Sequence, residues 1–320
     1  MEIIPGIHRL VGETGGRIVA FYLLRGERRS LLLDTAVQPM MDEVFFPYCG
    51  STGFDPSDLD YVLISHSDLD HSGGNAAVRK AAPRAVFACH RADRPLIEDV
   101  DTLIEKRYRC YAWDDGIDES DDGIEFIRKN VFHTPLDLTL SGGETFDLGG
   151  GRELEVLHLP GHSRGHVGLY DRTSDTLLAQ DAVLGKAVPF KDGSPAFPPT
   201  YRYYQPYLQT IARIEALAPA RLLTCHYRVL EGAAVGDFLA ESRAFAESLH
   251  GSLTDALRAA DRPVTMKELC ATLCEKLGDW APESSTFLCW PLTGHLEELQ
   301  SLGQCRKIRE NDLSHYQWTA

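Results

Sequence analysis

The sequence lacks long apolar runs and any excess of positive charge. None of its 320 residues belongs to an apolar stretch of about eighteen positions, and no basic leader opens the chain. Acidic side chains outnumber basic ones by 47 to 32, which leaves a formal net charge of −15. The lack of a leader and of an apolar span predicts a cytoplasmic protein. Because the net charge repels phosphate backbones and anionic lipids, we also expect the protein to avoid membranes and, over most of its surface, nucleic acids.

The eight cysteines lack the paired spacing of a disulfide framework. In a chain of this length, such cysteines are typical of buried thiols in a reducing compartment. Cys270 and Cys274 form a close pair, and their spacing of four residues places both on one helical face. Without a second pair nearby, that spacing favours core packing over a structural metal site.

The composition is that of a globular protein. Hydrophobic residues make up 43% of the chain and charged residues 25%, without low-complexity segments. A chain of 320 residues exceeds one average domain. We therefore expect one large domain and one small domain.

Short apolar runs joined by turns dominate the first two thirds of the chain. Residues 18–24 and 30–34 flank a charged turn and predict a hairpin. The apolar run 59–65 predicts a strand that ends directly on His66, and an Ala-rich helix and a strand at 85–88 follow. This alternation is typical of an α/β layer structure.

Three later strands also end beside side chains that commonly bind metals. Residues 154–159 precede His162, residues 177–180 precede Asp181, and residues 221–225 precede His226. Loops at strand ends frequently carry functional residues. We therefore expect four strand ends to converge on one site.

The densest group of potential ligands comprises His66, Asp68, Asp70 and His71, within six residues. A loop this short directs several side chains at one point only by alternating them around a turn. Two histidines and two carboxylates there suit two divalent ions about 3.5 Å apart. Asp70, Asp181 and His226 would each be ordinary loop residues if taken alone, but their joint order disfavours that interpretation.

In this order, the motifs resemble the signature of the metallo-β-lactamase superfamily, H-x-H-x-D-H followed by a P-G-H-T-like motif, an aspartate and a last histidine. The corresponding segments read S-H-S-D-L-D-H-S-G-G, P-G-H-S-R-G-H, L-L-A-Q-D-A and L-L-T-C-H-Y, with gaps of 91, 19 and 45 residues. The resemblance covers about residues 1–235. It implies an α/β fold, an αββα sandwich over residues 1–240, with a small, mostly helical, winged-helix-like domain over residues 241–320.

The resemblance also implies a ligand set and a reaction. The first metal would be bound by His66, Asp68 and His162, and the second by Asp70, His71 and His226, with Asp181 bridging the two. A metal-bridging hydroxide, oriented by Asp70 as the catalytic residue, would attack the carbonyl of a small ester, thioester or lactone. His166 follows His162 by four residues and is more often structural, so we leave it out of the ligand set.

Asp68 is the clearest departure from the family signature, because most members have histidine there. A carboxylate adds one negative charge and a harder ligand, which raises the expectation of iron or manganese relative to zinc. We therefore expect two divalent metal ions and leave their identity open. Diiron flavoproteins of the superfamily carry glutamate at this position, so a diiron oxygen-binding or redox protein is an alternative, although no flavodoxin-like domain follows.

Two segments are expected to cover the site. Residues 101–130 are acidic and irregular in pattern, which predicts an insertion or lid. Residues 185–205 are rich in aromatic side chains, which predict either a wall for an acyl or aryl substrate or packing within the loop. Candidates for such a wall are Tyr201, Tyr203 and Tyr204.

The C-terminal region changes to a helical pattern. Helices are expected over 238–259, 265–277 and 285–302, with a hairpin through 306–312. Thirteen acidic and eight basic side chains over 236–320 disfavour a nucleic-acid phosphodiesterase, the other alternative function. A structural, substrate-capping or dimerising role, the last as a homodimer, fits this charge better.

Overall fold

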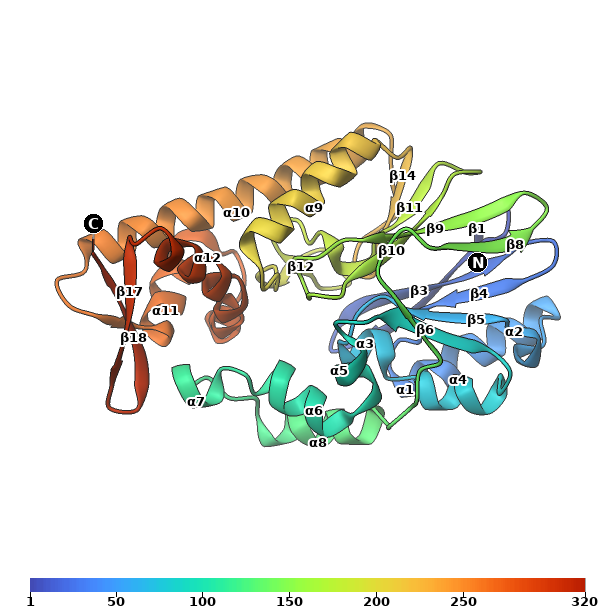
Figure 1. Ribbon diagram of the computed structural model, residues 1–320, viewed down its shortest axis with the longest axis horizontal. Coiled ribbons are helices and arrows are strands. Elements are labelled where there is room, and N and C mark those ends of the chain that lie inside the picture. The colour runs from blue at the N-terminus through green and yellow to red at the C-terminus, as the bar shows by residue number, and fades with distance from the viewer. Residues whose placement is uncertain (320) are drawn as a thin grey trace.

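Two β-sheets pack face to face in the computed structural model, which describes residues 1–319 (Figure 1). The first sheet runs in the order β1 (Glu2–Ile4), β2 (Ile7–Thr14), β3 (Arg17–Arg25), β4 (Ser30–Leu33), β5 (Tyr61–Ile64), β6 (Val86–His90) and β7 (Leu138–Leu140). The second runs in the order β15 (Leu230–Glu231), β14 (Arg221–Leu223), β11 (Thr176–Leu178), β10 (Val167–Asp171), β9 (Arg152–His158) and β8 (Thr145–Gly149). The expected hairpin of β3 and β4 is confirmed.

Strand β3 shows why the sheets stack in layers. Its central residues are buried on both faces. Phe21 and Leu23 pack among the helices outside the first sheet, whereas Tyr22 and Leu24 pack between the two sheets. A sheet covered on both faces produces a continuous apolar run instead of an alternating one, as the sequence shows here. The predicted α/β sandwich is confirmed.

Helices cover the outer face of each sheet. Outside the first sheet lie α1 (Gln38–Met40), η1 (Met41–Phe45), α2 (Phe46–Thr52), η2 (Pro56–Asp58), α3 (Leu69–Ser72), α4 (Asn75–Ala81) and α5 (Arg94–Glu98). Outside the second lie α9 (Tyr204–Leu217) and α10 (Ala233–Ala259). The turn η4 (Gln180–Ala182) and the short strands β12 (Val188–Pro189) and β13 (Pro195–Phe197) connect β11 to α9.

The segment expected to be irregular, 101–130, is largely helical. It forms α6 (Val100–Leu103), η3 (Ile104–Tyr108), α7 (Ala112–Asp115) and α8 (Asp121–Asn130). Ser120 caps α8 by accepting a hydrogen bond from the amide of Gly123, and Ile127 packs against Leu103. Most acidic residues of the segment lie on exposed faces or in the first turns of these helices, although Asp115 is buried, and these charges hid the apolar pattern.

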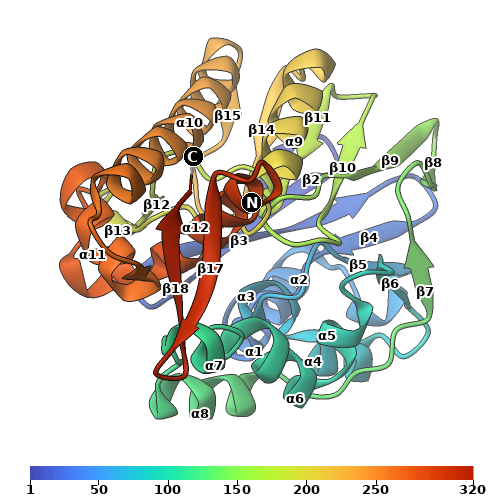
Figure 2. The same ribbon diagram turned by 60° about the vertical axis from the view of Figure 1, so that its left-hand side comes forward.

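The C-terminal region packs beside these helices (Figure 2). It contains α10, β16 (Val264–Thr265), α11 (Met266–Leu277), η5 (Pro282–Leu288), α12 (Cys289–Ser301), β17 (Cys305–Glu310) and β18 (Leu313–Trp318). Its three strands pair in the order β16-β18-β17. The predicted domain division at residue 240 falls inside α10, so that division and the winged-helix-like form stay predictions. Among residues 1–319, no helix has the length and apolarity to cross a membrane.

Candidate metal centre

The loop after β5 brings four of the predicted ligands to one place. The chain turns from Ile64 into the short helix α3, and a pair of glycines follows it. A Cβ on Gly74 would lie 2.2 Å from the carbonyl oxygen of Thr35, and one on Gly73 would lie 2.6 Å from that of Leu69. Both glycines have negative φ, so they are required for close backbone approach and not for a left-handed backbone conformation.

All seven predicted ligands lie in three overlapping clusters, within which potential ligand atoms are at most 4.8 Å apart. His66, Asp68 and His162 form the first ligand group. Asp70, His71 and His226 belong to the second ligand group, together with Cys225, which sequence reasoning had placed only in a strand. A third cluster of His66, His71 and Asp181 joins the two groups. The structure thus brings the predicted set together, while ligation itself stays a prediction.

The imidazole rings are held by hydrogen bonds on their Nδ1 atoms. His71 Nδ1 lies 2.7 Å from Asp34 Oδ2, His226 Nδ1 lies 2.8 Å from the carbonyl oxygen of Ile18, and His66 Nδ1 lies 3.0 Å from Ser65 Oγ. The Nε2 atoms of His66 and His71 are buried and have no hydrogen-bond partner. Metal-binding histidines are typically fixed in this way, with one nitrogen oriented by the protein and the other left for the ion.

Asp34 organises this arrangement and was missed by sequence reasoning. Its carboxylate accepts hydrogen bonds from Ser65 N at 2.7 Å, Ser65 Oγ at 2.8 Å and Gln180 Nε2 at 2.5 Å, besides its contact with His71. It is fully buried and has a φ of 64°. The signal was present, because Asp34 follows an apolar strand just as His66 does.

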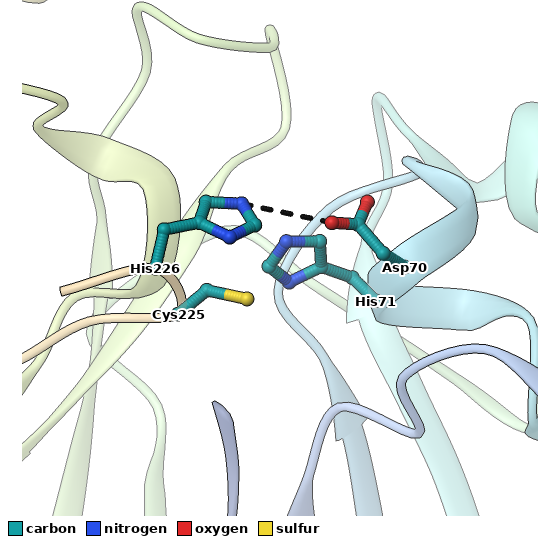
Figure 3. Close-up of side chains that lie close together, drawn as sticks. All are labelled: Asp70, His71, Cys225 and His226. Atoms are coloured by element: carbon teal, nitrogen blue, oxygen red, sulfur yellow. Dashed lines mark ion pairs between the residues drawn. The ribbon is translucent and has the colours of Figure 1, made fainter. Parts of the chain in front are cut away.

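The second ligand group joins residues from opposite sides of the sandwich (Figure 3). His226 Nε2 lies 3.2 Å from Asp181 Oδ2 and 3.6 Å from Asp70 Oδ2. His71 Nε2 lies 3.5 Å from Asp181 Oδ2. Figure 3 shows Asp70 and His71 opposite Cys225 and His226, with the Cys225 sulfur on the His71 side. Two imidazole nitrogens, two carboxylates and a thiol fit a divalent ion.

Electrostatics also favour positive charge in the second ligand group. Burial alone would lower the pKa of His226, but Asp181 and Cys225 hold it well above the ordinary value. Burial would raise the pKa of Asp181, but His226 and His71 hold it well below. Negative charge therefore dominates this group, and a metal ion would satisfy the same demand that protons on the histidines otherwise meet.

Arg107 gives the first ligand group a different environment. Its Nε and Nη2 atoms donate to Asp68 Oδ1 and Oδ2 at 2.6 and 2.7 Å, and Nη2 lies 3.2 Å from His162 Nε2. Burial would raise the pKa of Asp68, but this guanidinium, with the adjacent histidines, holds it well below its usual range. Because Asp68 is already paired with a cation, the first group does not fit a metal ion as the second does. Arg107 belongs to the segment expected to be irregular, so the sequence gave no signal for its role.

Two further residues surround the first ligand group. The ring of His166 is fully buried, stacks on that of His66 with centroids 4.8 Å apart, and has no hydrogen-bond partner at either nitrogen. Asp93 holds the loop that carries His162, because it accepts hydrogen bonds from Ser163 Oγ at 2.5 Å and Gly165 N at 2.8 Å. Neither belongs to the three potential ligand clusters among residues 1–319.

A cavity of about 470 Å³ opens onto both ligand groups. Three segments contribute aromatic side chains to its walls: Phe190 and Phe197, Tyr108 and Tyr111, and Phe287 and Trp290. Polar side chains such as Arg17, Asp118 and Ser284 line it as well. Phe197 and Phe287 stack with ring centroids 4.9 Å apart, and Arg17 lies over Phe197. The segments that line the cavity outside the ligand groups, called the cover below, therefore include the 101–130 segment and the C-terminal region.

The three tyrosines proposed for this wall have other surroundings. Tyr201 is fully buried and its hydroxyl lies 2.8 Å from His295 Nε2. Tyr204 is buried, and its ring centroid lies 3.9 Å from that of His295. Tyr203 accepts a hydrogen bond from Arg164. Packing within the protein explains them, whereas the phenylalanines of the same segment line the cavity.

Comparison with known proteins places this geometry in a family. The family described as the metallo-beta-lactamase superfamily matches residues 14–226. A solved metallo-beta-lactamase family protein from Thermus thermophilus superposes with a TM-score of 0.78 at 23% identity, over 99% of this chain and 100% of that one. A beta-lactamase domain protein from Burkholderia ambifaria gives 0.73 at 18% identity, over 100% of this chain and 94% of that one. At these identities the structures show the fold alone.

Relatives found by sequence match only part of the chain. An acyl-coenzyme A thioesterase from Gallus gallus is 27% identical over 178 residues, 53% of this chain and 59% of that protein. A protein named as a diflavin flavoprotein from Nostoc is 24% identical over 173 residues, 53% of this chain and 24% of that protein. An uncharacterized protein from Methanocaldococcus jannaschii is 28% identical over 124 residues, 39% of this chain and 30% of that protein. The chain therefore spans less than two thirds of each relative.

Proposed function

Because this chain belongs to the metallo-beta-lactamase superfamily, we propose that it is a metal-dependent hydrolase of a small ester, thioester or lactone. One observation carries the proposal. The buried Nε2 atom of His71 has no hydrogen-bond partner, although it lies 3.5 Å from an Asp181 carboxylate that borders a 470 Å³ cavity. A buried nitrogen left unpaired beside a carboxylate is costly unless a cation joins them.

The second ligand group would hold the metal, through His71, His226, Asp70 and Asp181. When bound, a divalent ion there polarises a carbonyl and makes water more acidic. Zinc, iron and manganese remain the candidates. Cys225 supplies a softer donor than carboxylate, which favours zinc over manganese.

The protein's own side chains would orient the substrate. Tyr108 lines the cavity, and its hydroxyl oxygen accepts a hydrogen bond from the amide of Leu69 at 3.0 Å. Burial, and then the charge of Asp68, raises the pKa of Tyr108 well above its ordinary value, so the phenol keeps its proton and is able to donate to a substrate oxygen. Phe190 and Phe287 would exclude water from the acyl or aryl part of the substrate.

Two findings support acyl substrates. Aromatic side chains form part of the cavity wall, and a partial relative is an acyl-coenzyme A thioesterase. A thiolate leaving group needs little help from a general acid, which suits a site whose ionisable groups are engaged with each other.

A substrate panel tests the proposal. Acyl-coenzyme A, acyl-glutathione, lactone and phosphodiester compounds would be offered to metal-loaded protein. We expect turnover of an ester, thioester or lactone that a chelator abolishes and added metal restores. Asp181→Asn should lose this turnover, whereas Arg109→Ala, which removes an exposed ion pair with Asp118, should retain it. Metal-loaded protein that is inactive on the whole panel would contradict the proposal.

A diiron oxygen-binding or redox protein is the second candidate. The partial match to a diflavin flavoprotein and the carboxylate at Asp68 favour it. The pairing of Asp68 with Arg107 weighs against it, because a diiron site needs that carboxylate for iron. An iron-loaded sample whose absorption spectrum does not change on exposure to oxygen would eliminate this candidate.

The nucleic-acid phosphodiesterase has less support. Three basic side chains lie close together in the C-terminal sequence, Arg306, Lys307 and Arg309, and the last two are paired with Asp114 at 3.0 and 2.6 Å. The phosphodiester arm of the substrate panel covers this candidate.

A further inference from the structure

We propose that Arg107 is the resident cation of the first ligand group, so that the folded protein binds one divalent ion, at the second ligand group, and not two. This inference concerns metal content and does not depend on which bond the protein hydrolyses. It departs from the two-ion expectation that the family signature implies.

Arg107 is bound by specific contacts with members of the first ligand group. Two parallel hydrogen bonds at 2.6 and 2.7 Å join its guanidinium to both oxygens of Asp68. This bidentate geometry is the strongest form of guanidinium–carboxylate pairing. The Nη2 atom also lies 3.2 Å from His162 Nε2, which itself lies 3.0 Å from Asp68 Oδ2. The guanidinium therefore contacts two of the three members of the first group.

Arg107 is held in this position from its other side. Its guanidinium carbon lies 3.9 Å from the centroid of Trp290, which stands at the start of α12. The residue as a whole is only 6% exposed. To admit a metal at Asp68, the arginine would have to leave two charge-assisted hydrogen bonds and an aromatic stack, or remain close to a second buried cation.

The balance of charge favours the same assignment. In the first group, the single positive charge of Arg107 neutralises Asp68. The two imidazoles of this group add no charge in their neutral form, which is the form that binds metals. Around His226 of the second group, Asp70 and Asp181 supply two negative charges, which one divalent ion neutralises. Asp34, which lies 2.7 Å from His71 Nδ1, adds negative charge beside the second group. A further ion in the first group would leave an excess of buried positive charge.

Metal counting tests the proposal. Chelated protein would be titrated with Zn²⁺, and bound metal measured by calorimetry and by elemental analysis after desalting. We expect one equivalent for the wild type and two for Arg107→Ala, in which Asp68 becomes available. Arg107→Lys keeps a cation and should bind one. Arg109→Ala, which removes a neighbouring arginine that pairs with Asp118 instead, is the matched control and should bind one.

Asp68→Asn provides an independent measurement. If Arg107 is the resident cation, Asp68 is not a ligand in the wild type, and the variant should keep its one equivalent of Zn²⁺. Two equivalents of similar affinity in the wild type, none in the wild type, or loss of metal in Asp68→Asn would each overturn the proposal. If Arg107→Ala fails to fold, as judged by circular dichroism, the counts for the wild type and Asp68→Asn still decide it.

Discussion

The two ligand groups have similar residue types but are completed by different parts of the molecule. The second group is built by loops at strand ends and by η4, and the residue that orients His71, Asp34, also follows a strand. The first group is completed by Arg107 from η3, which in turn stacks on the C-terminal region. Similar ligand residues therefore do not fix metal occupancy. The charge of a neighbouring segment, here Arg107 of η3, decides whether a carboxylate binds a metal ion or a side chain.

The largest effect is expected at Asp181, which contacts the histidines of the second group. Asp181→Asn removes one of two negative charges and should release the metal, reducing hydrolysis to the level of chelated protein. Elemental analysis and turnover of the best panel substrate measure both results. His166→Ala, which removes a ring stacked on His66 of the first group, should leave the metal count unchanged. Retention of metal by Asp181→Asn would contradict the assignment of the metal to the second ligand group.

Asp34 should be next in effect. Without its carboxylate, the His71 ring loses the hydrogen bond that orients it, and loss of such an outer partner typically lowers metal affinity about 10- to 100-fold. Competition with a chromophoric chelator measures the Kd of Asp34→Asn. Asp171 is also fully buried, but pairs with Arg152 away from the site. Asp171→Asn should therefore lower stability without changing that Kd, and an equal loss of affinity in both variants would contradict a specific role for Asp34.

Sequence reasoning succeeded for the potential ligands that follow apolar strands, a pattern that occurs four times in the chain. His66, His162, Asp181 and His226 all follow apolar strands, so a strand pattern and a residue type together located them. Strands β11 and β14 pair in parallel, and β9 runs in the same direction because β9 and β11 both pair antiparallel with β10. His162, Asp181 and His226 therefore leave one edge of the second sheet, whereas His66 follows β5 of the first sheet. Seven predicted ligands thus reached one region, although the oriented hydrogen bonds from Asp34 were not foreseen.

The cover could not be predicted in the same way. Arg107 and Trp290 are separated by most of the chain and meet through tertiary packing alone, which leaves no periodic signal. Charged residues also masked the apolar faces of the helices in 101–130, so α8 was not expected. The aromatic segment 185–205 was placed correctly, but sequence could not distinguish Phe197 in the cavity wall from Tyr201 in the core.

The cover should affect substrate binding more than metal binding. Phe287 is 40% exposed and lines the cavity from the C-terminal region. Phe287→Ala should raise KM for an acyl substrate about fivefold, corresponding to about 1 kcal/mol for a side chain that remains partly exposed. The metal count and kcat should change little. Leu302→Ala, an exposed apolar residue outside the cavity lining, is the control. A lower metal count in Phe287→Ala would show that the cover supports both groups.

The smallest effect is expected within the cover itself, at the start of α11. Thr265 and Glu268 form a capping box there. Hydrogen bonds from Arg262 and from the Thr265 amide lower the pKa of Glu268 to about 2. Because this pKa lies below its unfolded value of about 4.5, the carboxylate stabilises the fold above that pH, and the stabilisation is lost as pH falls towards 2.

Urea denaturation at several pH values measures this contribution. Thr265→Ala should lower the free energy of unfolding by about 1 kcal/mol, the usual loss for an N-cap. Glu268→Gln should be less stable than the wild type at pH 7, and the difference should shrink below about pH 4.5. Neither change should alter the one-ion metal content, since both residues belong to the start of α11 and not to the contact between Trp290 and Arg107. If Thr265→Ala admitted a second ion, the first group would depend on the stability of the whole cover and not on Arg107 alone.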